Sequence, residues 1–147
     1  MRKALILFIT AILFLSISSV LSFGSQQGKP DLRISEFKVT KVETQEVALR
    51  LEILLSVKNA GNANAKNFVI SIFYQTSLSD PWLKLQDFSS GPLGVNESTQ
   101  LTKIFDFEES VTHFFKAELD SKDEIVESDE YNNIGYSDTS QYAGHFE

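Results

Sequence analysis

The stretch from Val47 to Val57 constrains the fold most, because apolar side chains occupy every second position in it. Between them stand mostly polar or small residues, with Leu54 the one large apolar exception. A strand points successive side chains to opposite faces, whereas a helix would spread this pattern around its axis. We therefore expect a β-strand with one face in a hydrophobic core. The apolar set is Val47, Leu49, Leu51, Ile53, Leu55 and Val57.

Similar alternation recurs along the chain and is interrupted by turn-forming residues. Further strands are expected within 31–40, 68–74, 82–88, 101–107, 113–119 and from 134 onward. In 31–40 the apolar phase slips by one residue between Ile34 and Phe37, which predicts a β-bulge. Lys103 falls in the inward row of its strand. About seven short strands separated by turns predict an all-β fold, an antiparallel β-sandwich.

The N-terminus has the layout of a secretory signal peptide. Arg2 and Lys3 precede an apolar run over 4–21, and small or polar residues follow. The predicted organisation is a signal peptide over 1–24, a flexible lead-in over 25–30, the sandwich over 31–137 and a tail over 138–147. The apolar run is close to the ~20 residues of a spanning helix, so an uncleaved membrane anchor is the alternative. Either way we expect a secreted, periplasmic or cell-surface domain.

Charge and composition argue against several classes of function. A formal net charge of -7 argues against a nucleic-acid partner, which requires clustered basic residues. Without Cys, the chain has no disulfide, no thiolate nucleophile and no Cys-ligated metal. His113, in an apolar strand, is expected to be a packed residue. No Gly-x-Ser-x-Gly or His-Glu-x-x-His motif occurs, so we predict that the chain is not an enzyme, with a hydrolase as a remote alternative.

An acidic stretch between the last two strands is the first candidate site. Its carboxylate and amide oxygens are ligands that Ca²⁺ prefers, and no other cofactor is expected. Alternatively, Asp120, Asn132 and Asn133 bond free backbone groups of a hairpin, Ile125 plugs its base, and the other acids are solvated. The candidates are Asp120, Asp123, Glu127, Asp129, Glu130, Asn132 and Asn133. A second candidate is the turn containing Asn59 and Gly61, where Gly61 can take a positive φ.

Three stretches together resemble the CARDB domain, the cell adhesion related domain found in bacteria. They are Pro30-Asp31-Leu32, the segment 56–63 with Asn59 and Gly61, and the segment 120–133 that ends in Asn132-Asn133. The resemblance implies an immunoglobulin-like sandwich on bacterial or archaeal surface proteins. It also supports a structural role for the paired Asn residues.

These observations predict a secreted or surface-associated adhesion module. Such a module would recognise an extracellular or envelope protein, or a polysaccharide, through its loops and without catalysis. The alternative is a structural subunit of a cell-envelope assembly, recruited through a free sheet edge. Contact with a membrane is expected only if the signal segment stays uncleaved.

Overall fold

The computed structural model describes residues 28–42, 49–107 and 113–138, and all regular elements in these ranges are β-strands. The predicted signal peptide and nearly all of the predicted tail lie outside the described residues. No helix in the described ranges is long and apolar enough to cross a membrane. The strands are β1 Leu32–Lys41, β2 Leu49–Asn59, β3 Phe68–Gln75, β4 Leu83–Ser90, β5 Ser98–Phe107, β6 Phe114–Leu119 and β7 Ile134–Asp138.

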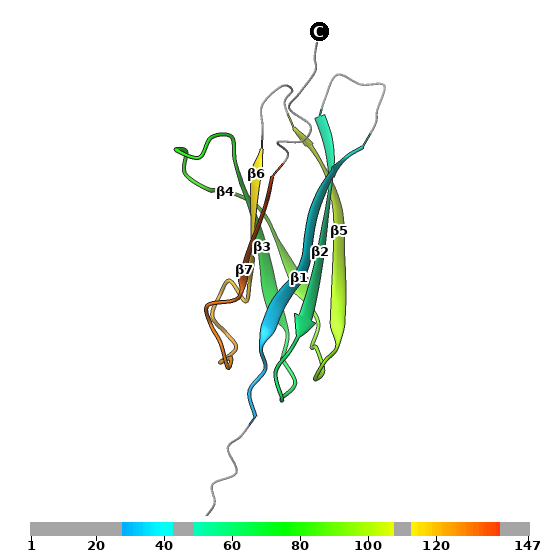
Figure 1. Ribbon diagram of the computed structural model, residues 1–147, viewed down its shortest axis with the longest axis vertical. Helices are drawn as coiled ribbons and strands as arrows, with labels where there is room; N and C mark the ends of the chain where they lie inside the picture. The colour runs from blue at the N-terminus through cyan, green and yellow to red at the C-terminus, as the bar shows by residue number, and fades with distance from the viewer. Residues whose placement is uncertain (1–27, 43–48, 108–112, 139–147) are drawn as a thin grey trace, which may run out of the picture.

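The seven strands form two antiparallel sheets that pack face to face (Figure 1). One sheet has the order β1-β2-β5, and the other has the order β4-β3-β6-β7. Because β5 returns to pair with β2 after two strands of the other sheet, the chain crosses between the layers in the manner of an immunoglobulin-like sandwich. The predicted all-β sandwich is confirmed.

The core consists of the inward rows that the alternation predicted. In β2, Leu51, Ile53, Leu55 and Val57 are at most 1% exposed, while the residues between them are half-buried. Opposite them lie Phe68, Ile70 and Ile72 of β3 and Phe115, Ala117 and Leu119 of β6. Each large apolar side chain sealed in this way contributes about 1.5–3 kcal/mol to folding. This buried row runs along the middle strand of its sheet, so β2 lies at the centre of the core.

The predicted bulge lies in β1, where the register with β2 shifts between Ile34 and Glu36. β1 also lies beside β7, although the two strands belong to different sheets. A side-chain carbon at Gly135 would come 2.8 Å from Ile34 Cδ1, so glycine allows this contact. The β1–β7 side of the sandwich is therefore closed by packing.

Lys103 lies on the side of the sandwich opposite the contact between β1 and β7. Its side chain belongs to the inward row of β5, but the residue is exposed and its Nζ lies 5.6 Å from the ring centroid of Phe88 in β4. β4 and β5 are edge strands of the two sheets. A charge pointing inward at a sheet edge discourages another chain from pairing there.

Candidate functional site

Both predicted loops lie at one end of the sandwich, together with the residues that lead into β1 (Figure 1). Ala60 N donates to Asp31 O at 2.7 Å, and Ser128 N donates to Pro30 O at 2.9 Å. The segment 29–31 thus runs between the turn after β2 and the 120–133 hairpin, and it joins the two.

Asn59 organises the turn. It is fully buried, and its Oδ1 accepts from Asp31 N at 3.1 Å and from Gly61 N at 3.0 Å. Its Nδ2 donates to Ala63 O at 2.8 Å and to Leu93 O at 3.0 Å. One side chain therefore satisfies four backbone groups from three segments.

Gly61 does not take the positive φ that its type allows, since no described glycine does. Its role comes from close packing: a Cβ would lie 2.4 Å from Lys29 O and 2.6 Å from Asp31 N. Only glycine lets the 29–31 backbone pass this closely.

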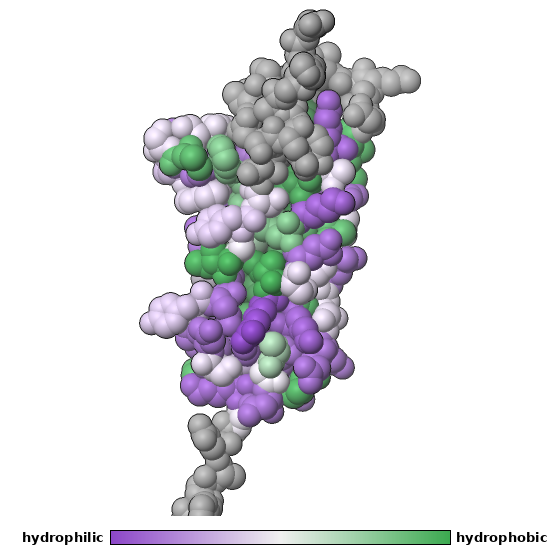
Figure 2. Space-filling model, viewed as in Figure 1, coloured by the Kyte–Doolittle hydropathy of each residue, from purple (hydrophilic) through white to green (hydrophobic). Residues whose placement is uncertain are grey.

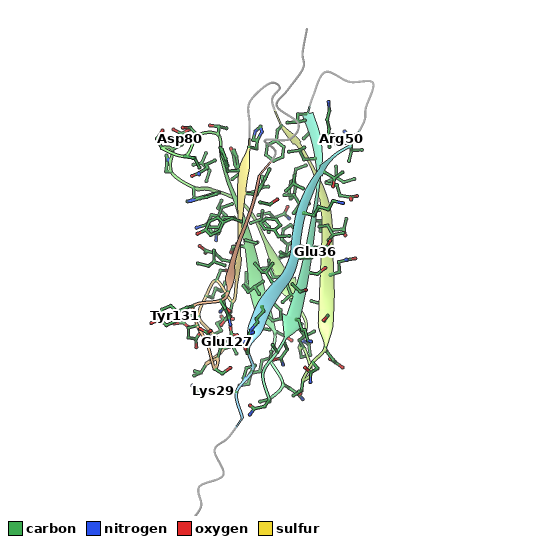
Figure 3. All side chains as sticks on the ribbon, in the orientation of Figure 1. Lys29, Glu36, Arg50, Asp80, Glu127 and Tyr131 are labelled. Atoms are coloured by element: carbon green, nitrogen blue, oxygen red, sulfur yellow. The ribbon has the colours of Figure 1, made fainter. Side chains whose placement is uncertain are left out.

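Glu127 is the most deeply buried carboxylate of the hairpin, at 2% exposure (Figure 3). It accepts hydrogen bonds from Leu32 N and, at 2.8 Å, from Asn133 Nδ2. Burial raises the pKa of Glu127, although these two bonds oppose the shift and the charges of Glu130 and Asp120 add to it. The side chain fastens the hairpin to the start of β1.

Asp31 is a site residue that the candidate set did not include. Its Oδ1 accepts from Asn132 Nδ2 at 2.8 Å, and its Oδ2 lies 2.5 Å from Arg33 Nη2. Burial by itself would raise the pKa of Asp31, but the hydrogen bonds from Arg33 and Asn132 and the charge of Arg33 outweigh it and lower the pKa. The Pro-Asp-Leu opening was the only sequence signal for this residue.

Three other hairpin acids accept hydrogen bonds from the hairpin's own backbone. Asp120 Oδ2 accepts from Ile125 N at 2.7 Å, Asp129 Oδ1 from Tyr131 N at 3.0 Å, and Glu130 Oε1 from Glu127 N at 2.7 Å. Asp120 and Asp123 have positive φ values of 45° and 53°, which Asp tolerates better than most residues.

Three buried oxygens of the hairpin have no hydrogen-bond partner among the described residues. They are Asp120 Oδ1, Asn132 Oδ1 and Asn133 Oδ1. Within the same ranges, no group of three or more His, Asp or Glu is placed to hold a metal ion. The three oxygens are one carboxylate and two amide oxygens, which are donor types that a hard cation such as Ca²⁺ accepts.

A second site, which the sequence reasoning missed, lies on the outer face of the four-stranded sheet. It is a pocket of about 280 Å³, and we call it the Trp82 pocket. The loop before β4 supplies Leu78 and Trp82 to its wall. The other lining residues come from β3, β6 and β7: Gln75, Phe114, Phe115, Tyr136 and Ser137. The 76–82 loop and the acidic hairpin lie at opposite ends of this sheet (Figures 1 and 3).

Aromatic rings line the Trp82 pocket, and one cation, Lys116, lies beside it. The Trp82 and Tyr136 ring centroids are 6.0 Å apart, with the rings tilted by 47°. Lys116 Nζ lies 5.4 Å from the Trp82 ring and 2.7 Å from Glu118 Oε1. Tyr136 is 65% exposed and Leu78 is 78% exposed. Apolar surface gathered in this way is typical of contact sites.

Gln75 adds an unused polar group to this wall. The residue is 5% exposed, yet its side-chain amide makes no hydrogen bond with any described residue. No atom of this amide is among the fully buried polar atoms without a partner in the described ranges, so the amide lies at the accessible surface of the pocket. The pocket therefore presents a donor and an acceptor that a bound molecule can satisfy.

In Figure 2, hydrophilic residues dominate the surface at the hairpin end, and apolar surface appears toward the middle of the molecule. The two ends thus differ in chemistry. Most hairpin acids accept hydrogen bonds from within the domain, whereas the Trp82 pocket combines the exposed Tyr136 with apolar side chains.

Comparisons with solved structures show the fold. The CARDB domain of the PF1109 protein from Pyrococcus furiosus, in complex with di-metal ions, superposes with a TM-score of 0.60 at 21% identity, over 75% of this chain and 91% of that one. A solution NMR structure of the same domain gives a TM-score of 0.57 at 20% identity, over 75% and 93% of the two chains. The β-glucosidase EmGH1 from Erythrobacter marinus gives 0.52 at 12% identity, over 74% of this chain but only 15% of the enzyme.

No curated protein matches the chain. The β-glucosidase likeness involves a small part of that enzyme and is a likeness of fold alone. The sequence matches the CARDB family over residues 29–137 of 147. The chain therefore belongs to the CARDB family.

Proposed function

We propose that the chain is a non-catalytic binding module of the adhesion type, acting outside the cytoplasm and contacting its partner through the Trp82 pocket. One observation carries this proposal: the exposed Tyr136 and the half-buried Trp82 line a pocket whose wall also includes the amide side chain of Gln75. Binding sites are mostly apolar hollows with a few placed polar groups, and this pocket has that composition.

The acidic hairpin is better suited to holding the domain together than to recognition. Glu127, Asp129 and Glu130 all accept hydrogen bonds from within the domain. Tyr131 is different, because it is 97% exposed and points away from the domain (Figure 3). Recognition through the hairpin and the Asn59 turn stays a prediction, and Tyr131 is the residue that tests it.

A surface-binding assay with matched tyrosine variants tests the proposal. The labelled domain is titrated onto cells or envelope fragments of the source organism. Tyr136→Ala should weaken binding by about tenfold or more, the loss of about 1.4 kcal/mol that one interface ring can supply. Tyr131→Ala is the control and should bind as the wild type does. The reverse result would assign recognition to the hairpin.

A second candidate function is cation binding by the hairpin, with Ca²⁺ as the expected ion. Its support is the set of buried oxygens without partners on Asp120, Asn132 and Asn133. The CARDB domain of PF1109 was itself solved with di-metal ions. A bound cation would also relieve the repulsion between Asp120 and the buried Glu127, which raises the pKa of Glu127.

Thermal melting separates this cation site from a purely structural hairpin. Millimolar Ca²⁺ should raise the melting temperature by several degrees over a chelator-treated sample. Asp120→Asn can keep an acceptor for Ile125 N while placing NH₂ at the free oxygen position, so it should abolish the rise. Equal melting temperatures with Ca²⁺ and with chelator would leave the hairpin a structural element alone.

A further inference from the structure

We infer that the Trp82 pocket recognises a neutral polysaccharide by seating a single sugar ring against Tyr136 and Trp82. This inference rests on the proposed binding function of the same pocket. It is carried by the size of the pocket, the arrangement of its rings, its charge balance and the strands around it.

The size suits one ring-shaped unit of a longer chain. Pockets for drug-sized molecules span about 300–1,000 Å³, and the Trp82 pocket, at about 280 Å³, lies just below that range. Its wall is open to solvent at Leu78 and Tyr136, which are 78% and 65% exposed. A polymer can therefore place one residue in the pocket while its neighbours continue over the surface.

The rings favour a ligand with a flat apolar face and polar edges. Trp82 and Tyr136 are 6.0 Å apart and tilted by 47°, which leaves no space to insert a planar group between them. A ligand must instead lie on the outward ring surface, as the C–H face of a pyranose does. Its hydroxyl groups would then reach the amide of Gln75 in the pocket wall.

Charge favours a neutral partner. Lys116 is paired with Glu118 at 2.7 Å, and Lys84 is paired with Asp87 at 3.0 Å. These cations are thus already compensated on this face. The chain as a whole carries a formal charge of -7, which repels polyanions. An acidic polysaccharide would meet no uncompensated cation among the residues that line the pocket.

The strands around the pocket disfavour an extended peptide. Gln75 of β3 pairs with Phe114 of β6, and Phe114 pairs in turn with Asp138 of β7. The backbone beneath the pocket is thus occupied in the sheet, and peptides that add to a sheet need a free strand edge. The edge strands of this sheet are β4 and β7. β1 packs against Gly135 of β7, and no residue of β4 lines the pocket. Recognition at this pocket is left to side chains.

The test uses the fluorescence of Trp82, which is the only Trp of the chain. The probes are soluble hexasaccharides of β-1,4-linked glucose, xylose, mannose and N-acetylglucosamine, with a proline-rich peptide alongside. At least one sugar should shift the emission saturably. Tyr136→Ala and Gln75→Leu should weaken that binding at least tenfold, and Tyr131→Ala should leave it unchanged.

Gln75→Leu has a second readout, because it removes an amide at the pocket surface and keeps a side chain of similar size. Its melting temperature should equal or exceed that of the wild type, so lost binding cannot be ascribed to unfolding. No saturable shift with any sugar, or a shift that survives both variants, would overturn the inference. A response to the peptide alone, lost in Tyr136→Ala, would overturn the sugar while keeping the binding function. Envelope binding that Tyr136→Ala leaves unchanged would overturn both the sugar inference and the proposed binding function of the pocket.

Discussion

At the scale of single residues, Asn59 holds the end of the sandwich together. Asn59→Ala removes four hydrogen bonds to backbone groups in a fully buried place. Each bond is worth about 0.5–1.5 kcal/mol, and the groups left behind lose their partners, so we expect a loss of about 3 kcal/mol in the free energy of unfolding. Denaturant titration measures it. Asn64→Ala, an exposed Asn with one weak bond to Val95 N at 3.3 Å, is the control and should change it by under about 0.5 kcal/mol.

The close packing of the 29–31 backbone against Gly61 leads to a second prediction. In Gly61→Ala the new methyl group would meet the backbone of Lys29, Pro30 and Asp31 at 2.4–2.6 Å, so the 29–31 segment must move away. We expect a loss above about 2 kcal/mol, as for overpacking against rigid neighbours. Gly91→Ala meets nothing within 4 Å and should leave the melting temperature unchanged or slightly higher. Similar melting temperatures for the two variants would contradict the role given to Gly61.

At the scale of elements, the sequence predicted the strands better than the sites. The period-two row of β2 and the phase slip in β1 are local patterns, and the structure confirms both. The Trp82 pocket left no such pattern, because Gln75, Phe114 and Tyr136 are far apart in the sequence and meet only when β3, β6 and β7 pair. Large aromatic residues at outward positions, such as Phe73 and Phe114, were the one available hint.

Strand β5 supplies a prediction about the free sheet edges. Lys103→Val removes the charge that points inward beside Phe88 and leaves an edge strand with an uninterrupted apolar row. Such an edge pairs readily with another chain, so we expect self-association that increases with concentration. Sedimentation velocity measures it, with Lys103→Arg as the charge-preserving control. If the Val variant stays as monomeric as the Arg variant, Lys103 does not protect this edge.

At the scale of the whole molecule, the two ends of the four-stranded sheet differ in role. The hairpin end ties three distant segments together through Asp31, Asn59 and Glu127, and the Trp82 pocket at the other end faces outward. A sandwich of this kind supports many functions, so its topology alone could not identify the binding face. That face follows from where exposed side chains such as Tyr136 and Leu78 line a hollow beside Trp82.

The stability of the whole domain should depend on pH through the buried carboxyl of Glu127. Because burial raises the pKa of Glu127 above its unfolded value, the folded domain holds the proton more strongly between those two values. The contribution of Glu127 is then most favourable at low pH and is lost as the pH rises through its folded pKa. Asp31 acts in the opposite sense: its lowered pKa adds stability that disappears as the pH falls.

Glu127→Gln removes the pH-dependent contribution of Glu127 to stability and keeps that of Asp31. The melting temperature of the wild type relative to this variant should therefore fall as the pH rises from about 4 to about 7. A series of melts across that range measures the difference. Asp123→Asn changes an exposed carboxylate of the same hairpin, so its curve should run parallel to the wild type. A parallel curve for Glu127→Gln as well would mean that water or a bound cation stabilises the charge of Glu127 in the folded domain.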